Sequence, residues 1–176
     1  AIIYFVISLI LAVIIEKNIF IKIKNNFSLS YLLAIFLVFF LLIFNHLQWN
    51  YNNSFITAQH TFANANINGE GSGFKSLIKF FLEQFIVFGP LTLLFLLTIL
   101  YKYNKLSSGE KILIFLSFVP ILLVFFQAFI SRAHANWAAI AYVPATVLVA
   151  SQIVKYWPKT KFIYFGITII GVIFAV

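Results

Sequence analysis

The chain has 176 residues, of which 63% are hydrophobic and only 9% are charged. Soluble globular domains have about 45 to 50% apolar and about 25% charged residues, so this composition predicts an integral membrane protein. The 12 basic residues against 4 acidic ones give a formal net charge of +8, and the lack of Asp and Cys excludes an aspartate, a disulfide or a thiolate of this chain from any mechanism. The chain contains no Met and begins and ends in apolar runs, so we expect a fragment of a longer protein.

Six apolar stretches follow one another along the sequence. About 20 residues of helix cross the roughly 30 Å hydrocarbon layer, which the four inner stretches can do, and the first and last are interpreted as truncated spans. The runs are continuously apolar, whereas membrane strands alternate apolar and polar residues. We therefore predict an all-α membrane bundle of about six transmembrane helices in one polytopic domain, with spans at residues 1–15, 29–47, 77–100, 112–130, 137–154 and 162–176.

The distribution of lysines predicts the orientation of these spans. Cytoplasmic loops retain Lys and Arg, and nine lysines lie in the first, third and fifth loops, against Lys75, Lys79 and Arg132 in the others. Loops 48–76 and 131–136 are therefore expected outside the cytoplasm. Attraction to anionic lipid headgroups explains the lysines as well and agrees with the same topology, so the net charge requires no nucleic-acid partner. The nine inner lysines are Lys17, Lys22, Lys24, Lys102, Lys105, Lys111, Lys155, Lys159 and Lys161.

Small residues and prolines within the spans predict how the helices pack. Ala138, Ala141 and Ala145 fall on one helical face, where a neighbouring helix can approach closely. Prolines inside a span remove a hydrogen bond and permit a kink, and kinked helices can surround a cavity. The prolines concerned are Pro90, Pro120 and Pro144.

The long polar segment 48–76 is rich in Asn, Gln and Gly. Amides offer paired donors and acceptors that suit sugar hydroxyls, and aromatic rings suit sugar faces. An ordinary solvated Asn and Gly loop explains the same composition. The length of the segment and the position of Trp49 at the membrane face favour a functional role.

The short loop 131–136 contains Arg132, the one arginine of the chain, with His134, Asn136 and Trp137 close by. A guanidinium at the membrane face can bind two phosphate oxygens at once. The alternative is an interfacial arginine beside a tryptophan anchor, which membrane helices often have.

Metal binding and carboxylate chemistry have little support in this sequence. His46, His60 and His134 lack metal-ligand spacing, so we predict no metal site, and we name no cofactor; a divalent metal in a longer protein stays open. Glu83 follows Lys79 by four residues, which predicts a helical ion pair in preference to contact with a substrate.

Several motifs resemble one bacterial family. They are His46-Leu47-Gln48-Trp49-Asn50, residues 54–61, Asn66-Ile67-Asn68-Gly69, Gln84 to Pro90, and Phe129 to Ala139 with Ala141-Tyr142. In this order they resemble the dolichyl-phosphate-mannose protein mannosyltransferase-like membrane glycosyltransferases of glycosyltransferase family 39, related to the aminoarabinose transferases that modify lipid A. The resemblance covers about residues 45 to 150.

This resemblance implies a GT-C fold in a bacterial inner membrane, with its active site outside the cytoplasm. Such a protein takes a sugar from a polyprenyl-phosphate donor and gives it to lipid A, another glycan or a protein. The family's catalytic carboxylate lies in an N-terminal loop without counterpart here, so we expect no catalytic residue in this chain and no activity of the chain by itself. We expect donor phosphate contacts from Arg132, His60 and Asn136, and sugar or acceptor contacts from Trp49, Asn50, Gln59, Asn66, Asn68 and Trp137.

Two residues depart from the family pattern, one just before the long loop and one within it. Asn45 stands where the family commonly has Pro, and Gln59 stands where it has Arg, which removes a cationic contact.

The alternative function is a membrane transporter or lipid flippase, because kinked helices with few charges suit alternating access. Transporters usually place polar groups at mid-membrane, whereas the polar groups here gather at one predicted face.

Overall fold

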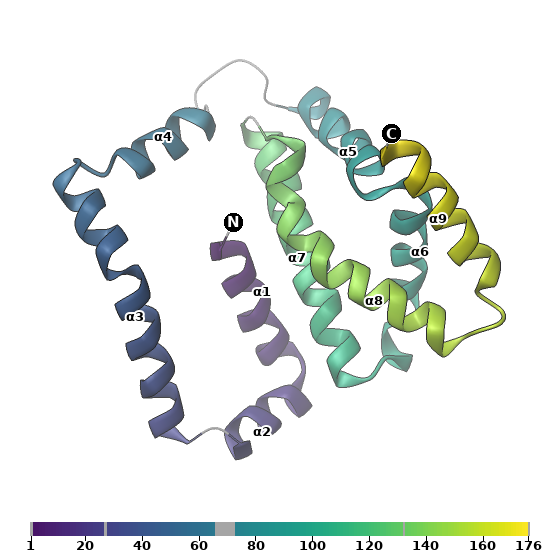
Figure 1. Ribbon diagram of the computed structural model, residues 1–176, viewed down its shortest axis with the longest axis horizontal. Coiled ribbons are helices and arrows are strands. Elements are labelled where there is room, and N and C mark those ends of the chain that lie inside the picture. The colour runs from purple at the N-terminus through teal and green to yellow at the C-terminus, as the bar shows by residue number, and fades with distance from the viewer. Residues whose placement is uncertain (1, 27, 66–72, 132, 176) are drawn as a thin grey trace.

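The structure is a computed structural model that describes residues 2–26, 28–65, 73–131 and 133–175, and within these ranges every regular element is a helix (Figure 1). This confirms the all-α prediction. The N-terminal part consists of α1 (Ile2–Ile15), α2 (Lys17–Asn26), α3 (Leu29–Asn52) and α4 (Ile56–Ala65). The rest consists of α5 (Phe74–Phe88), α6 (Pro90–Tyr101), η1 (Tyr103–Lys105), α7 (Ser108–Ile130), η2 (Ala135–Ala141), α8 (Tyr142–Lys155) and α9 (Lys161–Ala175).

Helix α7 is the centre of the bundle. It packs against α1, α5, η2 and α8, while α9 packs on α6 and α8. Helix α3 stands apart from this bundle in Figure 1, and Asn50 is the one buried residue among those described in it. The long side chains of α3, such as Leu42 at 76% exposure, therefore face outward, as expected of a helix surrounded by lipid.

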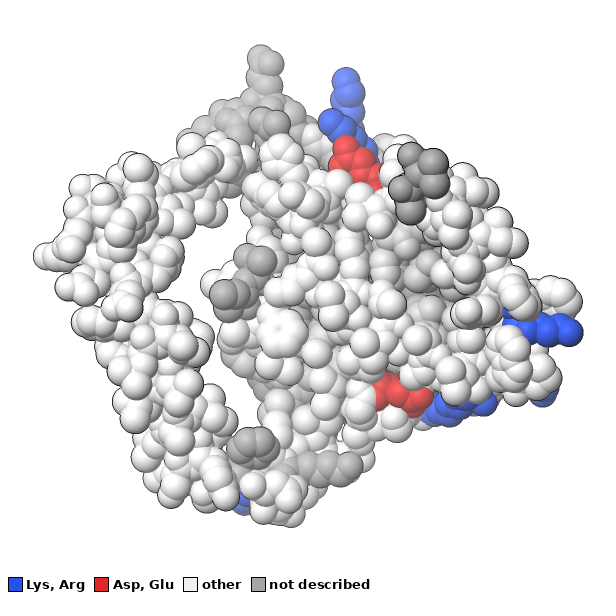
Figure 2. Space-filling view, in the orientation of Figure 1, with Lys and Arg blue, Asp and Glu red and all other residues white. Residues whose placement is uncertain are grey.

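Three described helical segments are long and apolar enough to cross a membrane, or up to five if each bent pair of helices forms one span. The three are α3, α7 and the continuous segment Ala135–Lys155, whereas the sequence predicts about six spans. Helices α1 and α9 have only 14 and 15 residues, which is short of the roughly 20 that a full crossing needs. Figure 2 shows a visible face with few charged side chains, which lie at its rims.

The expected span at 77–100 is divided into two helices. Helices α5 and α6 meet at Gly89 with a bend of 104°. Gly89 has a φ of 85°, which L side chains rarely adopt, and Pro90 occupies the first turn of α6, where its missing N–H costs no helical hydrogen bond. Pro120 lies inside α7 without ending it, and Pro144 lies in the first turn of α8. Of these three prolines, only Pro90 therefore adjoins a large change in the direction of the chain.

Two clusters form the core, one toward each end of α7. Ala138 belongs to one cluster and Ala145 to the other, and all three residues of the predicted small-residue face, Ala138, Ala141 and Ala145, are fully buried. One cluster joins α6, α7 and α8 around Leu96 and Leu148, and the other joins α5, α7 and η2 around Phe80. Small side chains thus let η2 and α8 approach α7 closely.

The lysine-rich end of the bundle is held by two ion pairs. Lys111 contacts Glu16 at 3.0 Å, and Lys155 contacts Glu110 at 3.1 Å. The Tyr103 hydroxyl also donates to Glu16, and this hydrogen bond, with that of Lys111, lowers the pKa of Glu16. Burial and the same hydrogen bond raise the pKa of Tyr103. These contacts join the start of α7 to the turn between α1 and α2.

The two segments predicted to lie outside the cytoplasm meet at the opposite end. The backbone N–H of Gly73 donates to the carbonyl of Phe129 at 2.7 Å, and the rings of Phe74 and Phe129 meet edge to face at 5.3 Å. The structure shows them at one end of the bundle, and their side of the membrane stays a prediction.

The described parts of segment 48–76 are more helical than expected of a loop rich in Asn and Gly. Helix α3 continues to Asn52, helix α4 occupies ten residues, and α5 starts at Phe74. Residues 56–65 contain no Gly or Pro, so nothing in them opposes a helix. The reversal between α3 and α4 lies at Ser54 and Phe55, whose φ angles of 53° and 56° are uncommon for residues other than Gly.

Candidate functional site

A pocket of about 360 Å³ lies where α1, α4, α7 and η2 meet, and it unites the two segments singled out in the sequence. Thr61 and Asn64 come from α4, and Asn136 and Trp137 come from η2. The remaining lining residues are Tyr4, Gln127, Ala139 and Ile140. Residues 61–64 and 136–137 thus lie around one cavity although more than 70 residues separate them.

Local helical structure sets the positions of the polar side chains in this pocket. Thr61 donates to the carbonyl of Thr57 at 2.8 Å, and the Asn64 amide lies 2.9 Å from Nδ1 of His60 one turn earlier. This contact fixes His60 against a lining residue, although His60 does not itself line the pocket. Residues separated by four positions lie one above the other on a helix, which explains both contacts.

The opposite wall contains a long-range polar contact. The Tyr4 hydroxyl donates to Oε1 of Gln127 at 2.7 Å and so connects α1 to the last turn of α7. The amide nitrogen of Gln127 is not used in this bond and is chemically able to donate to a ligand.

A second polar pair, Gln84 and Tyr142, joins α5 to α8 near this end of the bundle. Gln84 is 2% exposed, its amide donates to the carbonyl of Phe80, and its Oε1 accepts from the Tyr142 hydroxyl. The Tyr142 ring stacks on Phe88 with centroids 4.8 Å apart. Because both polar groups have partners, they fix α5 against α8 beneath η2.

The pocket combines polar and apolar side chains and carries no charge among its described lining residues. Its donors and acceptors are hydroxyls and amides from Tyr4, Thr61, Asn64, Gln127 and Asn136. Such groups suit the hydroxyls of a sugar, and the half-buried indole of Trp137 suits the apolar face of a sugar ring. The ring of His134 meets Trp137 at 5.4 Å and supports its orientation.

The predicted site residues divide into three groups. Asn136 and Trp137 line the pocket, and His60 contacts it through Asn64. Trp49, Asn50 and Gln59 lie outside its lining; Asn50 is bound to His46, and the Gln59 amide donates to the carbonyl of Ser54. Arg132, Asn66 and Asn68 lie outside the described residues.

Four polar lining residues are absent from the sequence-based prediction. Thr61 and Asn64 lie one and four residues after His60. If a helix had been predicted here, this spacing would have placed them near His60. Gln127 is an isolated amide in an apolar span, which was also a signal. Tyr4 has no such signal, because its contact with Gln127 crosses 123 residues.

The predicted ion pair on α5 is confirmed. Lys79 lies 3.9 Å from Glu83, and the lysine side chain is largely exposed. Glu83 is therefore explained by a helical surface contact, which is worth little in stability.

The fold and the pocket together define a helical membrane protein with a cavity at one end, whose described lining contains amides and hydroxyls but no charged group. A stretch of 116 residues, 65% of the chain, is 34% identical to the lipid A galacturonosyltransferase RgtD of Rhizobium johnstonii (strain DSM 114642 / LMG 32736 / 3841). The chain spans 24% of the length of that relative. No family model matches the chain, and no solved structure matches it.

This similarity supports kinship with glycosyltransferases and does not distinguish the predicted subfamily. Together with the apolar helices, it supports a bacterial membrane protein.

Proposed function

We propose that the chain belongs to a membrane glycosyltransferase that moves a sugar from a polyprenyl-phosphate donor to an acceptor outside the cytoplasm. The observation that carries this proposal is the pocket that unites Thr61 and Asn64 with Asn136 and Trp137. Thr61, Asn136 and Trp137 belong to motifs that resemble the mannosyltransferase-like family, which is related to the lipid A aminoarabinose transferases, and Asn64 lies between two of these motifs. The donor class and the GT-C fold belong to this proposal.

The proposed reaction is a displacement at the anomeric carbon of the sugar. The bond from this carbon to the phosphate oxygen breaks, the acceptor hydroxyl oxygen bonds to the carbon, and the hydroxyl proton passes to a base. The described pocket lining contains no carboxylate, in keeping with a base supplied from elsewhere in the protein. The amides of Asn64 and Gln127 orient the sugar, while Arg132, with His60 and Asn136, is proposed to bind the departing phosphate.

Lipid A is the acceptor that we propose first, because RgtD is a lipid A galacturonosyltransferase by name. Another glycan or a protein is the alternative acceptor. The many exposed apolar side chains on the helices let both a lipid-linked donor and a lipid acceptor approach from within the membrane.

The function is tested in membranes from cells that express the protein, compared with membranes from a strain that lacks it. A panel of polyprenyl-phosphate sugars, including the galacturonate, is offered with lipid A, a glycan and a protein fraction. We expect labelled sugar on lipid A only where the protein is present. Transfer that is independent of the protein for every donor and acceptor would contradict the proposal.

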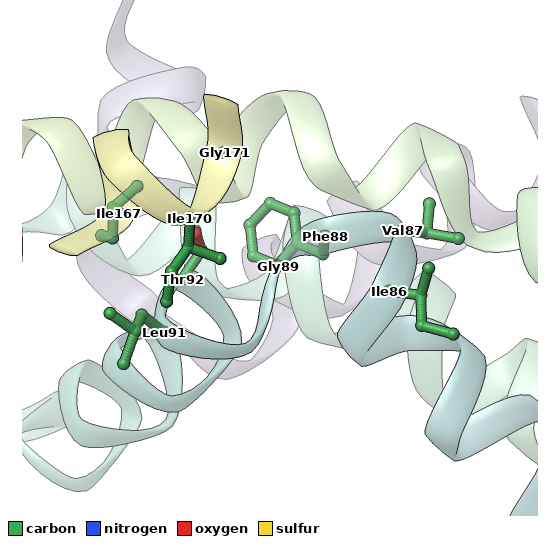
Figure 3. A pocket seen from close by; sticks show the side chains of 9 residues that line it. All are labelled: Ile86, Val87, Phe88, Gly89, Leu91, Thr92, Ile167, Ile170 and Gly171. Carbon is green, nitrogen blue, oxygen red and sulfur yellow. The ribbon is translucent and has the colours of Figure 1, made fainter. Parts of the chain in front are cut away.

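A transporter is the competing function, and the broken helix pair α5 and α6 is the feature that favours it, since transporters bind substrates at such breaks. The pocket at this break is about 240 Å³ and is shown in Figure 3. Its side chains are apolar apart from the Thr92 hydroxyl, and they come from α5, α6 and α9. This break therefore lacks the charged or amide groups that bind a polar substrate, which favours the glycosyltransferase. Substrate flux without sugar transfer in proteoliposomes would reverse this preference.

A further inference from the structure

A further pocket lies at the lysine-rich end, on the opposite end of the bundle from the proposed sugar site. Its volume is about 460 Å³, and the C-terminal end of α6, the end of α8 and the start of α9 surround it. Its charged side chains are Lys102 and Lys159, and its apolar ones are Phe95, Ile99 and Ile163. The remaining lining residues are the uncharged polar Thr98, Gln152, Tyr156 and Thr160.

The lining changes from apolar to cationic along α6. Phe95 and Lys102 are seven residues apart, which corresponds to about 10 Å of helix at 1.5 Å per residue. Ile99 is 3% exposed and lies between them. A molecule with an apolar chain and a charged head matches this gradient, whereas a small ion would use only the cationic end.

The two lysines of this pocket have no carboxylate partner in the described part of the chain. The glutamates described there pair elsewhere: Glu16 with Lys111, Glu110 with Lys155, and Glu83 with Lys79. The ends of α6 and α8 each contribute a partial negative charge of roughly half a unit, which is less than the two ammonium charges. The pocket is therefore electropositive.

The ring of Tyr156 contacts two lysines at the cationic end of the pocket. The Lys102 Nζ lies 5.7 Å from the centroid of the Tyr156 ring, and the Lys155 Nζ lies 5.8 Å from it. The Thr160 side chain, 7% exposed, donates to the carbonyl of Ile153 and fixes the turn that carries Lys159. Gln152 is buried, and its neutral amide donates to Glu110, so it does not change the charge of the pocket.

We propose that this pocket binds an anionic phospholipid, with its phosphate headgroup between Lys102 and Lys159 and an acyl chain against Phe95, Ile99 and Ile163. Basic pockets between transmembrane helices are suited to such headgroups, and each lysine near the surface contributes to the attraction. The site differs from the sugar pocket in position and in charge, so it does not depend on the proposed glycosyltransferase function.

The test measures binding of phosphatidylglycerol and phosphatidylcholine to the purified protein by native mass spectrometry. The wild type is compared with Lys102→Gln/Lys159→Gln and with Lys17→Gln/Lys105→Gln, which removes two exposed lysines from the same end outside the pocket. We expect the pocket variant to bind phosphatidylglycerol roughly thirtyfold more weakly. The control variant should lose less than threefold, and phosphatidylcholine binding should be the same for all three proteins.

Equal losses in the two variants would assign the effect to general surface charge and overturn the proposal. Soluble glycerol phosphate is the second arm, because it shares the headgroup chemistry without the acyl chains. If it binds as tightly as phosphatidylglycerol, the pocket is an anion site and the lipid proposal is wrong. Much weaker binding of glycerol phosphate supports the apolar wall as part of the site.

Discussion

Asn64 and Asn136 face one cavity from α4 and η2, so their amides are the groups that the proposed sugar site depends on most. Replacing both by Ala removes hydrogen bonds worth about 0.5 to 1.5 kcal/mol each, so kcat/KM for sugar transfer should fall roughly tenfold or more. Asn53→Ala is the matched control, because Asn53 is exposed at the end of α3 and lies outside the pocket. Equal activity of the wild type, the double variant and Asn53→Ala would show that these amides do not contribute to sugar transfer.

Glu16 gives a second residue-scale prediction, on stability. Its pKa is lowered in the folded protein, so its contribution is present above about pH 4.5, the ordinary value, and is lost as the pH falls through the lowered pKa. Losing its charge-assisted hydrogen bonds to Tyr103 and Lys111 should lower the melting temperature by about 3 to 8 °C at pH 7.

The measurement is the thermal unfolding of wild type, Glu16→Gln and the exposed-pair control Glu83→Gln in detergent from pH 7 to pH 3. The difference between wild type and Glu16→Gln should disappear at acidic pH. A difference that stays constant over this range would show that the carboxylate charge is not responsible. Glu83→Gln should change the melting temperature little, because its pair with Lys79 is exposed.

At the scale of elements, Gly89 allows the sharp bend between α5 and α6. A side chain there is strained because φ is 85°, and an added Cβ would lie 3.4 Å from Oγ1 of Thr92. We expect Gly89→Ala to cost about 1 to 3 kcal/mol in unfolding free energy. Gly109→Ala is the control, because Gly109 is helical with open space around it and should be neutral or slightly stabilising. A neutral Gly89→Ala in the same denaturation assay would contradict the strained turn.

Sequence patterns predicted the elements better than their boundaries. Continuous apolar runs predicted helices, and the spacing of Ala138, Ala141 and Ala145 predicted their burial. Pro90 predicted that the span at 77–100 could kink, but the size of the bend at Gly89 was not predicted, because hydropathy records neither φ angles nor helix direction. Asn136 and Trp137 were named as site residues from their motif, whereas Tyr4 depended on a contact between distant segments that no local pattern contains.

For the whole molecule, the two ends of the bundle predict a membrane orientation. The end with Glu16, Lys111 and Lys155 should face the cytoplasm, and the end with the sugar pocket should face outward. The chain has no cysteine, so a single cysteine substituted into it is the one thiol of this chain that the reagent can label. In intact cells a membrane-impermeant thiol reagent should label Asn53→Cys and should label Lys105→Cys only after permeabilisation. The reverse pattern would invert the topology.

The central claim is that the pocket between α4 and η2 holds the lipid-linked sugar, and photolabelling tests it most directly. A polyprenyl-phosphate sugar with a photoreactive group on the sugar is irradiated with the protein in its native membranes, and labelled peptides are mapped by mass spectrometry. We predict label on Thr61 to Asn64 and on Asn136 to Ile140, reduced by unlabelled donor. Competable label confined to α9 and the break at Gly89, with none on these two segments, would contradict the account.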